Sequence, residues 1–420
     1  MSDLPKLRIL LVTRNLPPLV GGMERLNWHM ADELSRHAEV RIVGPAGSAA
    51  VAPATVAVDE VPLKPLWKFL VHAQWRALRV ARAWRPNVVL AGSGLTALAV
   101  WLAARASGAR AAVYVHGLDL AVGHPVYRCL WRPALCHMDH VIANSRPTAA
   151  LAQGIGVEPG RIGIVCPGVD LPANAMTPAY NAAEPHAPTH VRAGDGEAGV
   201  MGFRQRHRLG SHPLLLSVGR LSTRKGLREF VTHALPRIVA VWPDTVLLIV
   251  GDEPKQALHA EAQTPESILV AAKAVGVDGH LWFLGVITDY AELGAIYRTS
   301  DVHVFPVRHI PGDPEGFGMV AVEAAAHGLP TVAFAVGGVP DAVAPGASGW
   351  LAAPGDYEAF AGHVIEALAS GASTVTAETC RRFAERFAWP LFGEHLRNCL
   401  DIPSSGPADI TRTWQERNAP

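Results

Sequence analysis

The segment DVHVFPVRHIPGDPEGFGMVAVEAAAHGLP occupies residues 301–330, and its pattern changes along its length. It begins with an apolar run at Asp301–Phe305, passes through a loop rich in glycine and proline, and continues with a helix-forming stretch that starts near Gly318. A short buried strand followed by a turn and a helix is the unit from which parallel sheets are built. The segment therefore predicts an α/β fold.

The same alternation recurs along most of the chain. Five strands are predicted in the first part, at Arg8–Thr13, Val40–Val43, Val88–Ala91, Ala111–Val115 and His140–Ala143. Six are predicted in the second part, at Pro213–Val218, Thr245–Gly251, His280–Leu284, Asp301–Phe305, Pro330–Phe334 and Gly349–Ala352. We therefore expect two Rossmann-like, doubly wound parallel-sheet domains, whose ligands bind at the carboxyl ends of the strands.

The pattern also predicts how the chain is divided. We expect an N-terminal domain at 1–171, a linker or mobile insertion at 172–201, a C-terminal domain at 202–385, a helix at 386–402 that crosses back to the N-terminal domain, and a disordered tail at 403–420. The insertion is rich in Ala, Pro, Gly and His and lacks periodicity. The dipeptide Trp389-Pro390 should interrupt the helical stretch Ala377–Leu400, because proline lacks a backbone donor.

Composition excludes several classes of protein. The 420 residues carry 37 Lys and Arg against 37 Asp and Glu, so no global positive charge favours nucleic acid. The five cysteines form no CxxC or Cys/His pattern, which argues against a zinc site or a disulfide framework and favours the cytoplasm. We predict no signal peptide, and the uncharged stretch Val88–Ala104 is divided by Gly92 and Gly94 rather than continuous as a membrane span would be.

Two glutamates, Glu315 and Glu323, flank the predicted helix start at Gly318. Gly316 and Gly318 would let the backbone approach a ligand, and the N–H groups at the start of a helix favour an anion such as a diphosphate. Carboxylates would repel that anion, so we assign them to the neutral hydroxyls of a sugar or ribose. The pattern predicts a ligand that carries both negative charge and hydroxyl groups.

Cations lie at the end of another predicted strand. The segment Ser217-Val-Gly-Arg-Leu-Ser-Thr-Arg-Lys-Gly226 places Gly219, Arg220 and Lys225 directly after the strand Pro213–Val218. Such cations could neutralise a leaving diphosphate, a role that a metal would otherwise take. The chain contains no Asp-x-Asp motif, so we expect neither a metal nor another cofactor. After the first strand, Gly21-Gly22 opens a helix and would allow a close approach to a ligand.

Taken together, these motifs resemble the retaining glycosyltransferases of family 4, which have the GT-B fold. The resemblance covers nearly the whole chain apart from Leu171–Met201 and the tail. It implies that Glu323 contacts the nucleotide ribose, that Glu315 contacts the donor sugar, and that Arg220 and Lys225 bind the diphosphate. It further implies that the donor meets the Gly21-Gly22 loop, Gly219 and the backbone of Gly316, Phe317, Gly318, Met319 and Val320.

The same resemblance implies that His116, in Val115-His-Gly-Leu-Asp119, lies near the reacting sugar, and that Asp119, Asn144 and Ser145 line the cleft or the acceptor site. The expected reaction moves a hexosyl unit from a UDP- or GDP-sugar to a hydroxyl acceptor with retention and without a metal. Gly338-Val-Pro-Asp341 and Cys166-Pro-Gly-Val-Asp170 also match recurring segments, although Pro167 stands where many members have Asn.

Other interpretations remain open at this point. Gly92-Ser-Gly94-Leu-Thr-Ala97 fits the dinucleotide fingerprint of NAD(P)-dependent oxidoreductases, but it does not follow the first strand, and the next strand ends in His116 rather than in an acid. A silent nucleotide-sugar-binding protein, an epimerase and a phosphorylase are further alternatives. Asn144 and Ser145 could simply cap a helix.

Leu63–Pro86 is basic, aromatic and helix-periodic. It predicts either an interfacial helix that makes peripheral contact with a membrane, or a surface helix with its tryptophans in the core. A membrane contact would favour a glycolipid or lipid-linked oligosaccharide as the acceptor.

Overall fold

The computed structural model describes residues 7–172, 203–207, 209–253, 262–369 and 374–403. The predicted insertion and tail therefore lie almost entirely outside the described residues. Two compact units make up the chain: unit 1 comprises 1–113, 137–142 and 393–420, and unit 2 comprises 114–136 and 143–392. The boundary between the units passes through two strands of the first sheet and through the last helix.

The first sheet has seven strands in the order β3-β2-β1-β4-β5-β6-β7. They are β1 (Arg8–Val12), β2 (Glu39–Pro45), β3 (Ala57–Val61), β4 (Val88–Ala91), β5 (Arg110–Val115), β6 (His140–Ala143) and β7 (Ile162–Ile164). The pairs β1–β2, β2–β3, β1–β4 and β4–β5 are parallel. From β1, the chain builds the sheet outwards to one side through β2 and β3 and then to the other side from β4 onwards. The switch point, at which such sheets bind ligands, therefore lies at the end of β1.

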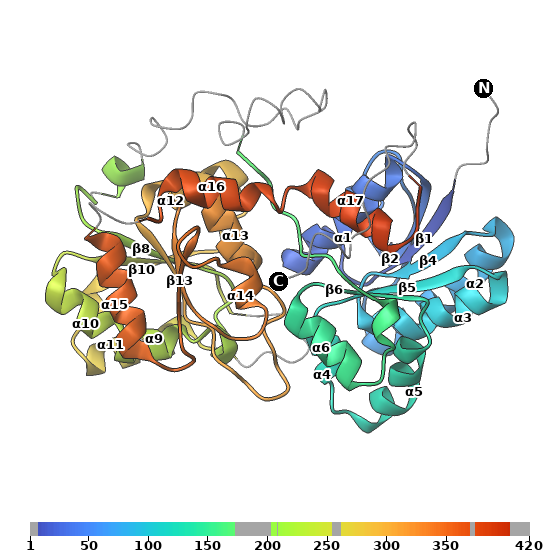
Figure 1. The fold of residues 1–420 in the computed structure, drawn as a ribbon, viewed down its shortest axis with the longest axis horizontal. Coiled ribbons are helices and arrows are strands. Elements are labelled where there is room, and N and C mark those ends of the chain that lie inside the picture. The colour runs from blue at the N-terminus through green and yellow to red at the C-terminus, as the bar shows by residue number, and fades with distance from the viewer. Residues whose placement is uncertain (1–6, 173–202, 208, 254–261, 370–373, 404–420) are drawn as a thin grey trace. The chain divides into compact units, whose positions relative to one another are not determined.

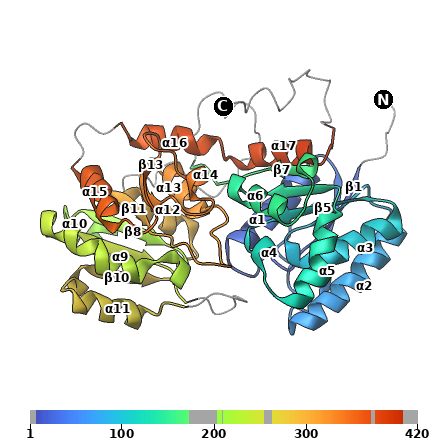
Figure 2. The same cartoon turned by 60° about the horizontal axis from the view of Figure 1, so that its bottom comes forward.

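The helices of this part follow the strands in turn. They are α1 (Gly22–Ser35), α2 (Leu66–Trp84), η1 (Gly94–Thr96), α3 (Ala97–Ser107), α4 (Leu118–Ala121), α5 (Pro125–Cys136), α6 (Arg146–Gly154) and η2 (Pro159–Arg161). Helices α2 and α3 pack side by side against the sheet (Figure 2). None of the described helices combines the length and the apolar composition that a membrane span requires.

The second sheet, which has helices on both of its faces in Figure 1, is parallel throughout, in the order β10-β9-β8-β11-β12-β13. Its strands are β8 (Leu214–Val218), β9 (Val246–Val250), β10 (Leu281–Gly285), β11 (Val302–Phe305), β12 (Thr331–Phe334) and β13 (Gly349–Ala352). The helices of this part of the sequence are η4 (Thr223–Lys225), α9 (Leu227–His233), α10 (Leu235–Val241), α11 (Pro265–Ala274), η5 (Asp278–His280), α12 (Tyr290–Thr299), α13 (Met319–Ala326), α14 (Val339–Ala342), α15 (Tyr357–Leu368) and α16 (Ala377–Glu385), followed by α17 (Trp389–Cys399), which is shared between the units.

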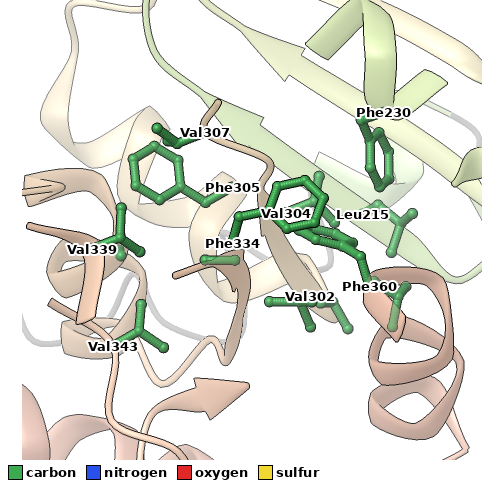
Figure 3. Packing of buried hydrophobic residues seen from close by; sticks show 14 of the residues in the cluster. Leu215, Phe230, Val302, Val304, Phe305, Val307, Phe334, Val339, Val343 and Phe360 are labelled. Carbon is green, nitrogen blue, oxygen red and sulfur yellow. The ribbon is translucent and has the colours of Figure 1, made fainter. Parts of the chain in front are cut away.

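Alternation along the strands divides the core of the second sheet between its two faces. On β8, Leu215 packs into the cluster that includes Phe230 and Phe360, whereas Leu214 and Leu216 pack with residues of α12. Figure 3 shows the first cluster, in which the rings of Phe230 and Phe360 lie 5.5 Å apart. Both faces of the strands are buried, which explains the continuous apolar runs in the sequence.

The helical stretch Ala377–Leu400 is interrupted, as the sequence predicted, although proline does not break a helix there. Helix α16 ends at Glu385, and α17 begins at Trp389 with Pro390 in its first turn. Proline is tolerated at this position because the first N–H groups of a helix have no intrahelical partner.

Candidate functional site

The two predicted glutamates lie on one loop and helix of unit 2. Strand β11 ends at Phe305, and α13 begins at Met319, one residue after the expected start. Gly318 caps the helix with φ 112°, and a Cβ there would lie 2.9 Å from the ring of Phe305. Glycine is required at this position because both the backbone conformation and the space exclude a side chain. Glu315 precedes the helix, and Glu323 lies in its second turn.

Glu315 is the centre of a buried charge cluster. Lys225 Nζ donates a hydrogen bond to Glu315 Oε2 at 2.8 Å, and Arg224 Nε lies 3.4 Å from the same oxygen. Burial alone would raise the pKa of Glu315, but the charges of Lys225 and Arg224 outweigh burial and lower the pKa to about 2. Burial lowers the pKa of Lys225, and the carboxylate of Glu315 opposes that effect. The Lys225 ammonium also lies 4.6 Å from the ring centre of Phe305.

Arg220 lies close enough to this cluster to act on both partners. It follows β8, and its charge contributes to lowering the pKa of both Lys225 and Glu315. Its side chain is exposed, whereas Lys225 is mostly buried. Gly219 takes φ 137°, and its carbonyl oxygen occupies the place of a Cβ on Gly251. The ends of β8 and β9 therefore meet closely beside the cluster.

Arg224 also belongs to this cluster, although it was not among the residues predicted from the sequence. Its Nη1 donates to Asp313 Oδ1 and to the carbonyl oxygen of Pro314, both at 2.9 Å. It therefore fixes the loop that carries Glu315. The sequence could have indicated this role, because Arg224 and Lys225 are adjacent cations and Asp313 and Glu315 are two acids separated by one residue.

The remaining donor residues of the prediction surround the start of α13. Phe317 is buried and packs on Phe387, with ring centroids 5.7 Å apart, so only its backbone is available to a ligand. Met319 and Val320 are partly exposed in the first turn. In the second turn, Glu323 Oε2 accepts a hydrogen bond from the hydroxyl of Tyr297 at 3.1 Å. Tyr297 was not among the residues predicted from the sequence.

Gly316 meets the segment after β5, which also belongs to unit 2. A Cβ on Gly316 would lie 2.3 Å from the carbonyl oxygen of His116 and 2.7 Å from Asn144 Nδ2. The backbone N–H of His116 donates to Asp119 Oδ2 at 3.0 Å, and its ring packs against Tyr114. The structure thus brings His116, Asp119 and Asn144 into the neighbourhood of Gly316 and Glu315.

Ser145 and its successor connect two helices of the same unit. The Ser145 hydroxyl accepts from the N–H of Thr148 and caps α6, as the structural alternative predicted. Arg146 donates to Asp341 through both its backbone N–H and its Nε, each at 2.6 Å. Asp341 lies on α14, so an ion pair joins the start of α6 to the turn that follows β12.

Two predicted glycine segments lie in unit 1. Gly21 caps α1 and Gly22 is its first residue, at the end of the loop that follows β1. Gly92 follows β4, where a Cβ would lie 1.9 Å from Asn27 Oδ1 and 2.8 Å from the Thr13 side chain. Packing against the end of β1 therefore explains why Gly92 is glycine, without a bound dinucleotide.

Comparisons with known proteins agree with the geometry. A family model described as Glycosyltransferase Family 4 matches residues 20–172, and one described as Glycosyl transferases group 1 matches residues 212–370. A D-inositol 3-phosphate glycosyltransferase of Segniliparus rotundus is 30% identical over 283 residues, which are 64% of this chain and 55% of that protein. A second such enzyme, from Catenulispora acidiphila, is matched over 53% of its length, so the chain spans about half the length of these relatives.

Three further comparisons cover most of the chain. The GDP-mannose-dependent alpha-(1-6)-phosphatidylinositol monomannoside mannosyltransferase of Mycolicibacterium smegmatis is 27% identical, with 86% of this chain and 89% of that protein covered. Among solved structures, Anabaena HepE in complex with UDP has a TM-score of 0.74 at 18% identity and covers 94% of this chain and 100% of that chain. The lipopolysaccharide glycosyltransferase WaaG has a TM-score of 0.64 at 18% identity, with 95% and 100% covered.

Proposed function

We propose, on the premise that this chain belongs to the family 4 glycosyltransferases, that it transfers a hexosyl unit from a nucleotide diphosphate sugar to a hydroxyl acceptor. The GT-B fold predicted from the sequence, with two parallel α/β sheets, is confirmed. The observation that carries the proposal is the buried cluster of Lys225, Arg224 and Glu315 beside the start of α13.

The donor that fits best is a UDP- or GDP-sugar. HepE has been crystallised with UDP and with UDP-glucose, and the M. smegmatis relative is named for its dependence on GDP-mannose. In this chain, Arg220 and Lys225 supply positive charge at the carboxyl end of β8, and the start of α13 supplies backbone N–H groups for a diphosphate. Glu315, held by two cations, is suited to accept from the hydroxyls of the donor sugar.

We assign the reaction to a front-face displacement with retention. The acceptor oxygen forms its bond to the anomeric carbon on the face from which the diphosphate departs, while the bond between that carbon and the phosphate oxygen breaks. A departing phosphate oxygen takes the acceptor proton. Arg220 and Lys225 stabilise the charge that develops on the diphosphate, which is the term that usually dominates such catalysis. His116, Asp119 and Asn144 are proposed to contact the sugar or the acceptor.

We further propose that the acceptor is lipid-linked and that α2 brings the enzyme to a membrane from the cytoplasmic side. Two of the three tryptophans of α2 are exposed: Trp67, Val71 and Trp75 are 61%, 59% and 56% exposed and follow one another at a spacing of four residues. One face of the helix is therefore an apolar stripe, whereas Phe69, Ala73 and Ala77 are buried on the other.

Basic side chains border this stripe. Lys68 lies over Trp67, and Arg76 and Arg79 lie over Trp75, at 5.4–5.8 Å from the ring centres. Residues 63–86 contain six Lys or Arg and no acid. Exposed tryptophans with adjacent cations suit an anionic lipid surface, where each cation contributes about 1 kcal/mol. The five cysteines are free thiols, which fits a reducing compartment.

Co-sedimentation with phosphatidylserine-containing vesicles at low salt tests the membrane contact. Trp67→Ser combined with Trp75→Ser should abolish binding, whereas Val270→Ser, which removes an equally exposed apolar side chain from α11, should leave it unchanged. Absence of binding by the unaltered protein would reject the membrane proposal and leave the transferase proposal in place.

Nucleotide release tests the activity itself. The purified protein is supplied with UDP- or GDP-sugars and a lipid extract, with and without chelator. We expect release with one donor class, unaffected by chelator and lost in Glu315→Ala. Binding of a donor without release would favour the silent binding protein, and binding of NAD(P) alone would favour the oxidoreductase.

A further inference from the structure

Helix α13 contains a single charged residue. Its sequence is Met-Val-Ala-Val-Glu-Ala-Ala-Ala, and the glutamate, Glu323, is only partly exposed. A carboxylate among apolar residues costs stability unless hydrogen bonds compensate for the lost hydration. The hydrogen-bond donors around this carboxylate therefore contribute to holding it in place.

Tyr297 of α12 provides such a group. Its hydroxyl donates to Glu323 Oε2 at 3.1 Å, and Tyr297 as a whole is 1% exposed. The ring stacks on His327, with centroids 5.1 Å apart and planes at 16°. The hydroxyl is thus held at the end of a ring that cannot turn away from the carboxylate.

His327 completes the arrangement from the other side. Its Nδ1 lies 2.9 Å from the backbone oxygen of Glu323. A carbonyl oxygen only accepts, so the imidazole carries a proton on Nδ1 and donates it. His327 therefore connects the tyrosine ring to the helical turn that carries Glu323, and the three residues form one connected group.

We propose that Tyr297 is a positioning residue that fixes the Glu323 carboxylate for the ribose hydroxyls of the donor nucleotide and so sets the preference for ribonucleotides. A carboxylate offers about four acceptor positions, of which Tyr297 uses one, so Glu323 can accept from Tyr297 and from a ligand together. The inference rests on the proposed function, because the contact between Glu323 and ribose is part of it.

The test is calorimetric binding of UDP and GDP, each compared with its 2′-deoxy and 3′-deoxy forms. We expect the unaltered protein to prefer one ribonucleotide over its deoxy forms. Tyr297→Phe retains the stacked ring but loses the hydroxyl, and it should reduce that preference about tenfold, or about 1.4 kcal/mol. The affinity for the ribonucleotide should fall, whereas the affinity for the deoxy form should stay the same.

Two further variants separate positioning from stability. Thr299→Val removes another buried hydroxyl of α12, one that donates to the carbonyl oxygen of Ala295, and it should leave the preference unchanged. Glu323→Gln should reduce the preference, and adding Tyr297→Phe to it should cause little further loss.

The possible failures are distinguishable. An unchanged preference in Tyr297→Phe, with a reduced one in Glu323→Gln, would overturn the positioning role while the proposed function stands. Nucleotide binding without any preference for ribose would overturn the inference at its premise. No binding of either nucleotide would reject the proposed function and the inference with it.

Discussion

Replacing Lys225 by Met removes the closest partner of Glu315 and one of the two proposed diphosphate cations. Methionine keeps most of the apolar stem but loses the ammonium, which lies 4.6 Å from the ring centre of Phe305. Glu315 is 9% exposed and would retain Arg224, whose Nε lies 3.4 Å away, and the weaker influence of Arg220. The substitution therefore affects both stability and catalysis, and the two effects can be measured separately.

The stability effect follows from the pKa of Glu315, which is about 2 in the folded chain against an ordinary 4.5. At 1.36 kcal/mol per pKa unit, the shift corresponds to a net stabilisation of the folded carboxylate by about 3 kcal/mol, which remains after the cost of burial. Lys225 is the cation that contributes most against that cost, although burial of its own ammonium offsets some of its contribution. We expect Lys225→Met to lower the free energy of unfolding by about 2 kcal/mol, which is less than the roughly 3–5 kcal/mol that breaking a buried ion pair usually costs, because Arg224 remains beside Glu315.

The catalytic effect should be larger than the stability effect explains. Loss of one preorganised donor to a developing charge costs on the order of 100-fold in turnover. We would measure nucleotide release with the donor that the unaltered protein uses, at a temperature at which the variant is folded. Arg41→Met is the matched control, because it breaks an ion pair in unit 1. In that pair, Arg41 Nε lies 2.6 Å from Asp59 Oδ2.

The double variant Lys225→Met with Glu315→Gln separates the two effects further. It removes the unpaired buried charge, so stability should recover while turnover stays low. Near-normal turnover in Lys225→Met, or recovery of turnover together with stability in the double variant, would refute a role for Lys225 at the diphosphate.

Three more predictions concern the same unit. Because the folded pKa of Glu315 is depressed, its stabilisation is complete above about pH 4.5 and disappears as the pH falls towards 2; urea unfolding across this window should show a decline that is smaller in Glu315→Gln. Gly316→Ala places a Cβ 2.3 Å from the His116 carbonyl oxygen, so thermal unfolding should show a loss of about 1–3 kcal/mol, and an unchanged melting temperature would contradict the packing. Gly168→Ala places a Cβ 2.2 Å from the Trp389 ring and should destabilise the chain similarly, with partial recovery when Trp389→Leu is added; no recovery would show that the ring is not the cause.

Most strands were predictable because both faces of each sheet are buried. Val88–Ala91, His140–Ala143 and Gly349–Ala352 have the predicted bounds, and the other predicted strands agree to within two residues at either end. Two strands of the first sheet were missed. β3 is an edge strand with the sequence Ala-Val-Asp-Glu-Val and little burial, and β7 is three residues long with a central glycine. Neither carries the apolar run that identified the others.

The sequence predicted only those residues of the candidate site that charge and the spacing of glycines indicate. The sequence placed Lys225 and Glu315 at two strand ends that the parallel sheet brings to one edge, but it assigned them to different parts of a ligand and did not predict that they pair with each other. Arg224 and Tyr297 were not predicted, because their roles depend on which atoms they reach. A buried tyrosine needs a partner for its hydroxyl, but the sequence does not tell whether that partner is a carbonyl oxygen or a functional carboxylate.

The glycines of the site show a different physical reason from the one that the sequence suggested. We expected Gly316 and Gly318 to let the backbone approach a ligand. Instead, the place of a Cβ on Gly316 is taken by His116 and Asn144, that on Gly318 by Phe305, and that on Gly338 by the carbonyl oxygen of Gly316. The absent side chains thus make room for other segments of unit 2, which contact the loop that carries Glu315. One of these contacts is a hydrogen bond in which the Gly338 N–H donates to the Glu315 carbonyl oxygen at 2.9 Å. A loop fixed on several sides can hold Glu315 and the start of α13 in one geometry before a donor arrives, and such preorganisation is what electrostatic stabilisation of a leaving diphosphate requires.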